Sequence, residues 1–219
     1  MITDLTFPYL LKEPKTANPK KQFLLLLHGF GSNEQDLFSF ADSLPPHIYV
    51  ASARAPIHLF PGGFAWYNID FTRGVKFTDS AQANDSLKGI SQFIEELKGK
   101  YQVETENFYL GGFSQGAIMS YGIAINHPTQ INGVIAMSGY VLKDILPDKV
   151  DREQVKKLKI FTTHGLVDEV IPVKMGQMGR DYMQGLGADI QYKEYPIGHG
   201  VSPEALHNIV RWFRGVLEG

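Results

Sequence analysis

Short apolar runs separated by longer amphipathic stretches constrain the fold of this chain more than any other feature of its sequence. Such runs are typical of buried parallel strands, because helices cover both faces of a parallel sheet. The predicted strands are residues 22–28, 48–53, 108–113, 133–138, 159–163 and 189–195.

The stretches between these strands have the spacing of amphipathic helices. The predicted helices are residues 78–101, 115–126, 172–185 and 203–217. Alternation of strand and helix indicates an α/β fold with a mostly parallel central sheet and helices on both faces. We expect a single domain over residues 1–219, with its catalytic groups on loops beyond the carboxyl ends of the strands.

The composition excludes several partners and several kinds of chemistry. The 21 Lys and Arg residues are scattered and balanced by 23 Asp and Glu residues, so no basic face indicates binding to nucleic acid. The chain has no cysteine, which excludes disulfides, thiolate metal sites and a cysteine nucleophile.

The N-terminal region has neither a targeting pattern nor a membrane-spanning pattern. Residues 1–4 lack a basic region followed by an apolar stretch, so they do not resemble a signal peptide. The apolar run at residues 23–27 is far too short to span a bilayer. We therefore expect a cytoplasmic protein with no integral membrane association.

The segment Gly112-Phe113-Ser114-Gln115-Gly116 fits the pattern G-x-S-x-G between a predicted strand and a predicted helix. This pattern is typical of a strained turn that projects a serine hydroxyl above the sheet. Side chains two residues before or after the serine would collide with backbone, so both positions favour glycine. The amino end of the following helix would stabilise negative charge. We therefore predict that Ser114 is the nucleophile of a hydrolase acting on carboxylic esters or thioesters.

A serine hydroxyl needs an imidazole to take its proton and a carboxylate to orient that imidazole. The turn at residues 112–116 is of the type called a nucleophile elbow, and we refer to it as the elbow. In hydrolases with such an elbow, the catalytic residues follow the chain order Ser, then Asp or Glu, then His. His199 is favoured as the base because it follows the last predicted strand, between Gly198 and Gly200. The other histidines after the elbow are interpreted as a helix stop, a hydrogen-bonding loop residue and a residue of the last helix: His127, His164 and His207.

The carboxylate is predicted in the loop that joins the strand at 159–163 to the helix at 172–185. Asp168 and Glu169 are adjacent in this loop, so the pattern alone leaves both open. Asp168 is favoured, because Glu169 precedes an apolar Val-Ile-Pro and is interpreted as facing water.

Attack on a carbonyl creates a negative oxygen, which two prearranged donors must stabilise. The first predicted donor is the backbone N–H of Gln115, directly after the nucleophile. The second is the N–H of Phe30, where Gly29 and Gly31 let the chain bend back. His28 is interpreted as an anchor of this loop. The alternative, that His28-Gly29 is an ordinary turn after a strand, stays open on this pattern.

These loops resemble the α/β-hydrolase superfamily and, within it, the phospholipase/carboxylesterase family that includes the acyl-protein thioesterases. The similar motifs appear in family order: Leu27-His28-Gly29-Phe30-Gly31, Ala65-Trp66-Tyr67, Gly112-Phe113-Ser114-Gln115-Gly116-Ala117, His164-Gly165-Leu166-Val167-Asp168-Glu169-Val170-Ile171-Pro172 and Gly198-His199-Gly200. The resemblance implies Ser114 as nucleophile, His199 as base and Asp168 as orienting acid. It assigns the oxyanion donors to Phe30 and Gln115. It further implies no cofactor or metal, short- to medium-chain acyl esters as substrates, and a possible homodimer.

Two motifs depart from the thioesterase pattern. Gly31-Ser32 stands where those members tend to have Gly-Asp, and Trp66-Tyr67-Asn68 replaces Trp-Phe-Asp. Both lie near the expected acyl site, so the chain resembles hydrolases of this family more closely than enzymes that depalmitoylate proteins. Trp66 and Tyr67, with Gly29, are predicted to contact the substrate. The alternative for the two aromatic residues is a packed surface loop.

Other functions remain as alternatives. A hydrolase-fold protein that only binds ligands would lack a member of the triad, and all three members are present here. A dienelactone-hydrolase-like enzyme would tend to have a cysteine at the elbow, which this chain lacks. Lysophospholipase or peptidase activity stays open. Only residues 55–78 are long enough to form a partial cover, so we expect little or no lid.

Overall fold

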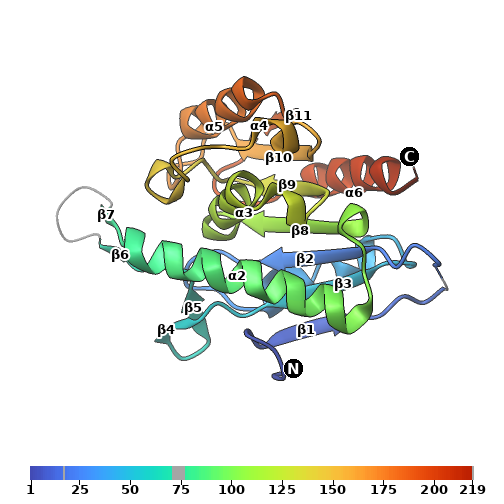
Figure 1. The fold of residues 1–219 in the computed structure, drawn as a ribbon. Coiled ribbons are helices and arrows are strands. Elements are labelled where there is room, and N and C mark those ends of the chain that lie inside the picture. Colours follow the sequence, from blue (N-terminus) through green and yellow to red (C-terminus); the bar gives the residue numbers. More distant parts are fainter. Residues whose placement is uncertain (17, 71–76, 219) are drawn as a thin grey trace.

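The structure, a computed structural model, describes residues 1–16, 18–70 and 77–218. Its main feature is a seven-stranded sheet in the order β1-β3-β2-β8-β9-β10-β11, which Figure 1 shows from blue β1 at the bottom to orange β11 at the top. Neighbouring strands are parallel, except that β1 and β3 pair antiparallel. The strands are β1 (Tyr9–Lys12), β2 (Phe23–Leu27), β3 (Tyr49–Ala53), β8 (Phe108–Phe113), β9 (Gly133–Met137), β10 (Lys159–Gly165) and β11 (Asp189–Tyr195).

Alternating side chains of β2 divide the core into two layers. Leu25 and Leu27 belong to one cluster of buried residues, whereas Leu24 and Leu26 belong to the other. Successive side chains of a strand point to opposite faces, so apolar residues at every position require cover on both sides of the sheet.

Helices α2, α3 and α5 contribute buried residues to the layer of Leu25 and Leu27, whereas α1 and α6 contribute to the layer of Leu24 and Leu26. The helices are α1 (Gln35–Phe38), α2 (Ser80–Tyr101), α3 (Gln115–Asn126), α4 (Arg152–Val155), α5 (Val173–Leu186) and α6 (Pro203–Glu218). Short 3-10 helices lie at Ala41–Ser43, Thr105–Asn107, Pro128–Gln130 and Lys143–Ile145. In the described parts of the chain, no helix is both long and apolar enough to cross a membrane.

This architecture confirms the predicted α/β fold, with its mostly parallel sheet between helices. The predicted strands and long helices are present, with small shifts at their ends. One detail was wrong: Pro172 caps α5 with an extended backbone (ψ 138°) instead of being its first helical residue. The fixed φ of proline suits both positions, so the sequence pattern did not separate them.

The prediction also missed several short strands. β1 is an edge strand of four residues, too short to show a clear pattern. Two small antiparallel sheets lie within the stretch that was expected to cover the site. They pair β4 (Ile57–Phe60) with β5 (Gly63–Ala65), and β6 (Ile69–Asp70) with β7 (Phe77–Thr78). Residues 71–76 of this expected cover lie outside the described residues.

Candidate active site

Ser114 lies on a sharp turn between β8 and α3. Its backbone has φ 54° and ψ −116°, a strained conformation for a residue with a side chain. A Cβ on Gly112 would lie 2.3 Å from the backbone of Gly116, and one on Gly116 would lie 2.0 Å from the carbonyl oxygen of Leu27. Both positions therefore require glycine, for the steric reason that the sequence pattern implies.

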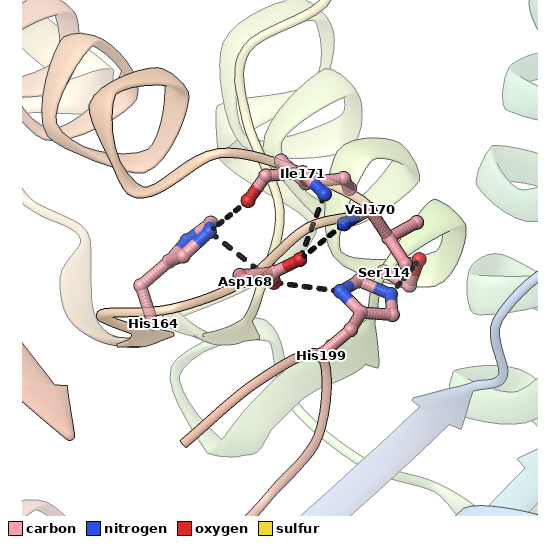
Figure 2. A network of polar contacts seen from close by, with 6 residues as sticks. All are labelled: Ser114, His164, Asp168, Val170, Ile171 and His199. Atoms are coloured by element: carbon pink, nitrogen blue, oxygen red, sulfur yellow. Dashed lines mark hydrogen bonds and ion pairs between the residues drawn. The ribbon is translucent and has the colours of Figure 1, made fainter. Parts of the chain in front are cut away.

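Ser114, His199 and Asp168 form a chain of two hydrogen bonds (Figure 2). Ser114 Oγ lies 2.8 Å from His199 Nε2, and His199 Nδ1 lies 2.7 Å from Asp168 Oδ2. A carboxylate only accepts hydrogen bonds, so Nδ1 carries the imidazole proton and Nε2 accepts from the serine hydroxyl. The structure thus brings together the three residues predicted as the triad, from loops beyond β8, β10 and β11. In this tautomer the imidazole can take the serine proton.

The carboxylate of Asp168 is held on both oxygens. Its Oδ1 accepts hydrogen bonds from the backbone N–H groups of Val170 (2.9 Å) and Ile171 (2.8 Å), while Oδ2 faces His199. The side chain of Asp168 is fully buried, whereas the adjacent Glu169 is exposed. This difference in burial and bonding distinguishes the two acidic residues that the sequence pattern left open.

The loop that carries His199 packs closely against the end of β10. A Cβ on Gly165 would lie 2.2 Å from the carbonyl oxygen of Gly198, so the two loops meet only because residue 165 is glycine. By contrast, a Cβ on Gly198 would make an ordinary contact at 3.8 Å, and one on Gly200 would meet nothing within 4 Å. The glycine that the site requires sterically is therefore the one after His164, not the two that flank His199.

The loop after β2 bends toward the elbow and is tied to its neighbours. Gly31 has a positive φ of 75°, and its N–H donates to the carbonyl of Phe64 at 2.9 Å. His28 is fully buried, and burial lowers the pKa of its imidazole. The Ala55 N–H donates to Nε2 of His28, so Nδ1 carries the proton and donates to the Gly29 carbonyl at 2.8 Å. His28 anchors this loop, as its position predicted.

An ion pair that the sequence analysis did not detect supports the same loop. Both oxygens of buried Glu34 accept hydrogen bonds from the guanidinium of Arg54, at 2.7 and 2.6 Å. These bonds hold the pKa of the Glu34 carboxyl below its usual range and raise the pKa of Arg54. The guanidinium also lies 4.5 Å from the centre of the Phe64 ring. Residues 20 positions apart carry no local pattern that would pair them.

The side chain of Gln115 has a role that the motif alone did not reveal. It is buried and binds backbone groups of two consecutive residues. Its amide oxygen accepts from the Trp66 N–H at 2.8 Å, and its amide nitrogen donates to the Tyr67 carbonyl at 2.7 Å. The elbow therefore fixes the segment that contributes Tyr67 to the cavity wall. The sequence signal for this role is the glutamine directly after the serine, because its side chain has both a hydrogen-bond donor and an acceptor.

The prediction that Trp66 contacts the substrate is corrected by the structure. Its side chain is fully buried and packs edge to face on Phe7 with ring centres 5.5 Å apart. Its indole N–H donates to the carbonyl of His28 at 3.0 Å. Trp66 therefore supports the loop after β2 from below, and Tyr67, the next residue, reaches the cavity instead.

A cavity of about 230 Å³ opens beside Ser114. Gly29, Phe30 and Gln115 lie on its wall, as does Tyr67, so these four predicted contact residues are near the serine. Tyr140, which the sequence analysis missed, lies on the same wall. The remaining lining residues are Ser32, Asp36, Ile69, Thr78, Phe113, Ile118, Val170, Ile171 and His199.

A mostly parallel sheet between helices, with a serine on a strained strand-to-helix turn, is typical of the α/β-hydrolase fold. The chain is structurally similar to the crystal structure of the Bacillus cereus carboxylesterase, with a TM-score of 0.81 and 18% identity over 97% of this chain and 96% of that one. The model of the phospholipase/carboxylesterase family matches residues 14–216. The chain therefore belongs to the phospholipase/carboxylesterase family.

Sequence similarity to relatives extends over most of the chain. It is 28% identical over 217 residues to acyl-protein thioesterase 1 of Kluyveromyces lactis, which covers 92% of this chain and 95% of the relative. It is 25% identical over 219 residues to a probable carboxylesterase of Oryza sativa subsp. japonica, with 92% of this chain and 80% of the relative covered.

Proposed function

We propose that this protein is a serine esterase that hydrolyses carboxylic esters or thioesters through an acyl intermediate on Ser114. The observation that carries the proposal is the pair of hydrogen bonds from Ser114 to His199 and from His199 to Asp168. Membership of the phospholipase/carboxylesterase family supports the same reaction type, as do relatives named as a thioesterase and a carboxylesterase.

In the first step, Ser114 Oγ attacks the carbonyl carbon of the substrate while His199 Nε2 takes the hydroxyl proton. The carbonyl oxygen becomes negative and accepts hydrogen bonds from the N–H groups of Phe30 and Gln115. Collapse of this intermediate breaks the bond to the leaving alcohol or thiol, which takes the proton from Nε2.

In the second step, His199 takes a proton from water, and the resulting hydroxide attacks the acyl-enzyme carbonyl. The second collapse releases the carboxylic acid and returns the proton to Ser114. Asp168 stays ionised throughout and stabilises the imidazolium that forms in each step. None of these reaction steps uses a cofactor or metal. Prolonged dialysis against EDTA should therefore leave turnover unchanged.

The size and lining of the cavity favour a short acyl group. Its volume of about 230 Å³ is below the roughly 300–1,000 Å³ of sites for drug-sized ligands. Ile118, Tyr140 and Ile171 supply an apolar wall for an acyl chain. We therefore propose small esters or thioesters as substrates, in place of esters with long fatty acyl chains.

Turnover of p-nitrophenyl acetate by purified variants tests the proposal. Ser114→Ala and His199→Ala should each lower kcat by about 10⁴-fold or more, because members of a triad act as a unit. Undiminished turnover by Ser114→Ala would overturn the proposal. Absence of activity from the wild-type protein on every ester tested would favour the alternative, a hydrolase-fold protein that binds ligands without cleaving them.

We propose three further properties of this protein. The first is that residues 1–219 form a single domain, which one cooperative unfolding transition would support. The second is a location in the cytoplasm, which cell fractionation would check. The third is a homodimer, as the family resemblance implies, which light scattering after size-exclusion chromatography would detect.

A further inference from the structure

A second histidine, His164, lies beside Asp168 and has no part in the reaction described above. It is in β10, one residue before the strand ends, and its side chain is fully buried. Its Nε2 lies 2.8 Å from the carbonyl oxygen of Ile171. A carbonyl oxygen only accepts, so the ring carries a proton on Nε2. Figure 2 shows this ring on the side of the carboxylate opposite His199.

His164 contacts the loop between β10 and α5 at two of its residues, Asp168 and Ile171. We call this segment, residues 166–172, the Asp168 loop. The His164 Nε2–H donates to the Ile171 carbonyl, and the N–H of the same Ile171 donates to Asp168 Oδ1 at 2.8 Å. The same Nε2 also lies 3.5 Å from Asp168 Oδ2, the oxygen that accepts a hydrogen bond from His199. The proton on Nε2 therefore adds positive potential at the carboxylate oxygen that orients the base.

Packing on the far side leaves this ring little freedom to turn. Nδ1 of His164 is buried and has no hydrogen-bond partner. A Cβ on Gly176 would lie 2.3 Å from this nitrogen, so helix α5 packs directly against the ring. A flipped ring would give the Ile171 carbonyl a carbon in place of an N–H donor. An unsatisfied buried polar atom costs free energy. This cost is tolerated at Nδ1 of His164, because Nε2 of the same ring holds the Asp168 loop.

We propose that His164 is a positioning residue, which orients the carboxylate of Asp168 toward His199 through the backbone of Ile171. This inference rests on the proposed function, because positioning matters only if the Asp168–His199 pair serves catalysis. Asp168 and His199 separate His164 from Ser114, and His164 does not line the cavity, so it does not touch the substrate. Its loss should therefore lower kcat and leave KM little changed.

The experiment compares three variants by kinetics and by NMR. His164→Leu fills the space without a donor, whereas His164→Gln can place an amide N–H near the position of Nε2. Thr162→Val is the matched control in the same strand, since it removes a buried 2.7 Å hydrogen bond between Thr162 and Tyr121 of α3. Selective ¹⁵N labelling of histidine shows the low-field ring protons of the seven histidines. The one that is lost in His199→Ala is the proton on His199 Nδ1, which reports the hydrogen bond to Asp168.

We expect His164→Leu to lower kcat about 10- to 100-fold, the range for groups that orient catalytic residues from behind. The low-field proton of His199 should shift or disappear in the same variant, and His164→Gln should restore both readouts in large part. Thr162→Val should lose thermal stability while keeping kcat and the resonance.

Two results would overturn the inference. One is a folded His164→Leu protein with an unchanged resonance and unchanged kcat. The other is a Thr162→Val protein that loses kcat as much as His164→Leu does, since the effect would then follow stability alone. The NMR readout does not need turnover, so it separates failure of this inference from failure of the proposed esterase function.

Discussion

Glu34 and Arg54 connect two segments that meet beside the cavity. Glu34 lies four residues after Phe30 in the chain, and Arg54 follows β3 and stacks on Phe64. The side chain of Glu34 is 3% exposed and that of Arg54 is 27% exposed. A pair that is this buried and bidentate is worth more than a surface ion pair, because water and salt screen it less.

Glu34→Gln should lower the free energy of unfolding by about 2 kcal/mol at pH 7, the typical worth of a hydrogen bond to a charged group. The bonds to Arg54 lower the folded-state pKa of Glu34 from its usual 4.5. This stabilisation is therefore present above pH 4.5 and is lost as the pH falls through the lowered pKa.

Urea denaturation of both proteins at pH 7 and at low pH measures this effect. Asp85→Asn is the control, because its ion pair with Lys88 is 77% exposed on both sides and should contribute little. An equal loss in the two variants, or a difference between wild type and Glu34→Gln that grows at low pH, would contradict the account.

At the level of residues, the sequence predicted positions better than contacts. Ser114, Asp168 and His199 could be found because each follows a strand and their chain order matches a known pattern. The role of Gln115 and the burial of Trp66 could not be found. Both depend on which loops meet in space, and residues 49 and 38 positions apart form those hydrogen bonds.

At the level of elements, close backbone contacts at Gly112 and Gly116 constrain the strand–turn–helix unit from β8 to α3. The sequence predicted its bounds correctly, because apolar runs define β8 and α3 and the pattern His127-Pro128 ends the helix. Short elements such as β1 and β4 were missed. Their four residues each give no periodic signal, and their pairing with distant segments defines them.

Gly116→Ala should destabilise the protein by about 3 kcal/mol, the upper range for overpacking, because the added methyl would collide with the carbonyl of Leu27. Gly99→Ala is the matched control in α2, where an added Cβ meets nothing within 4 Å. This control should gain up to about 1 kcal/mol from its higher helix propensity. Thermal unfolding of both proteins checks the pair, and similar melting temperatures would argue against a crowded elbow.

At the level of the whole molecule, strand order places the candidate catalytic residues side by side. β8, β9, β10 and β11 are neighbours in the sheet, and the loops beyond β8, β10 and β11 carry Ser114, Asp168 and His199. β2 lies on the other side of β8 and brings Phe30 to the same cavity. The carboxyl edge of one parallel sheet thus collects all the groups that the proposed reaction needs.

The small cavity leads to a prediction about chain length. In a p-nitrophenyl ester series from two to sixteen carbons, kcat/KM should be highest for short acyl groups and fall for long ones, because the cavity of about 230 Å³ cannot enclose them. Steady-state kinetics below the micelle-forming concentration of each ester provides the measurement. A maximum at sixteen carbons would show that long chains bind outside the described cavity.

The central claim, that Ser114 is an activated nucleophile, is tested most directly by reaction with a fluorophosphonate followed by peptide mapping. The account predicts one phosphonyl group per chain on Ser114, no label in Ser114→Ala, and much slower labelling in His199→Ala, since the imidazole activates the hydroxyl. Labelling at another residue, or equally fast labelling of Ser114 without His199, would contradict it.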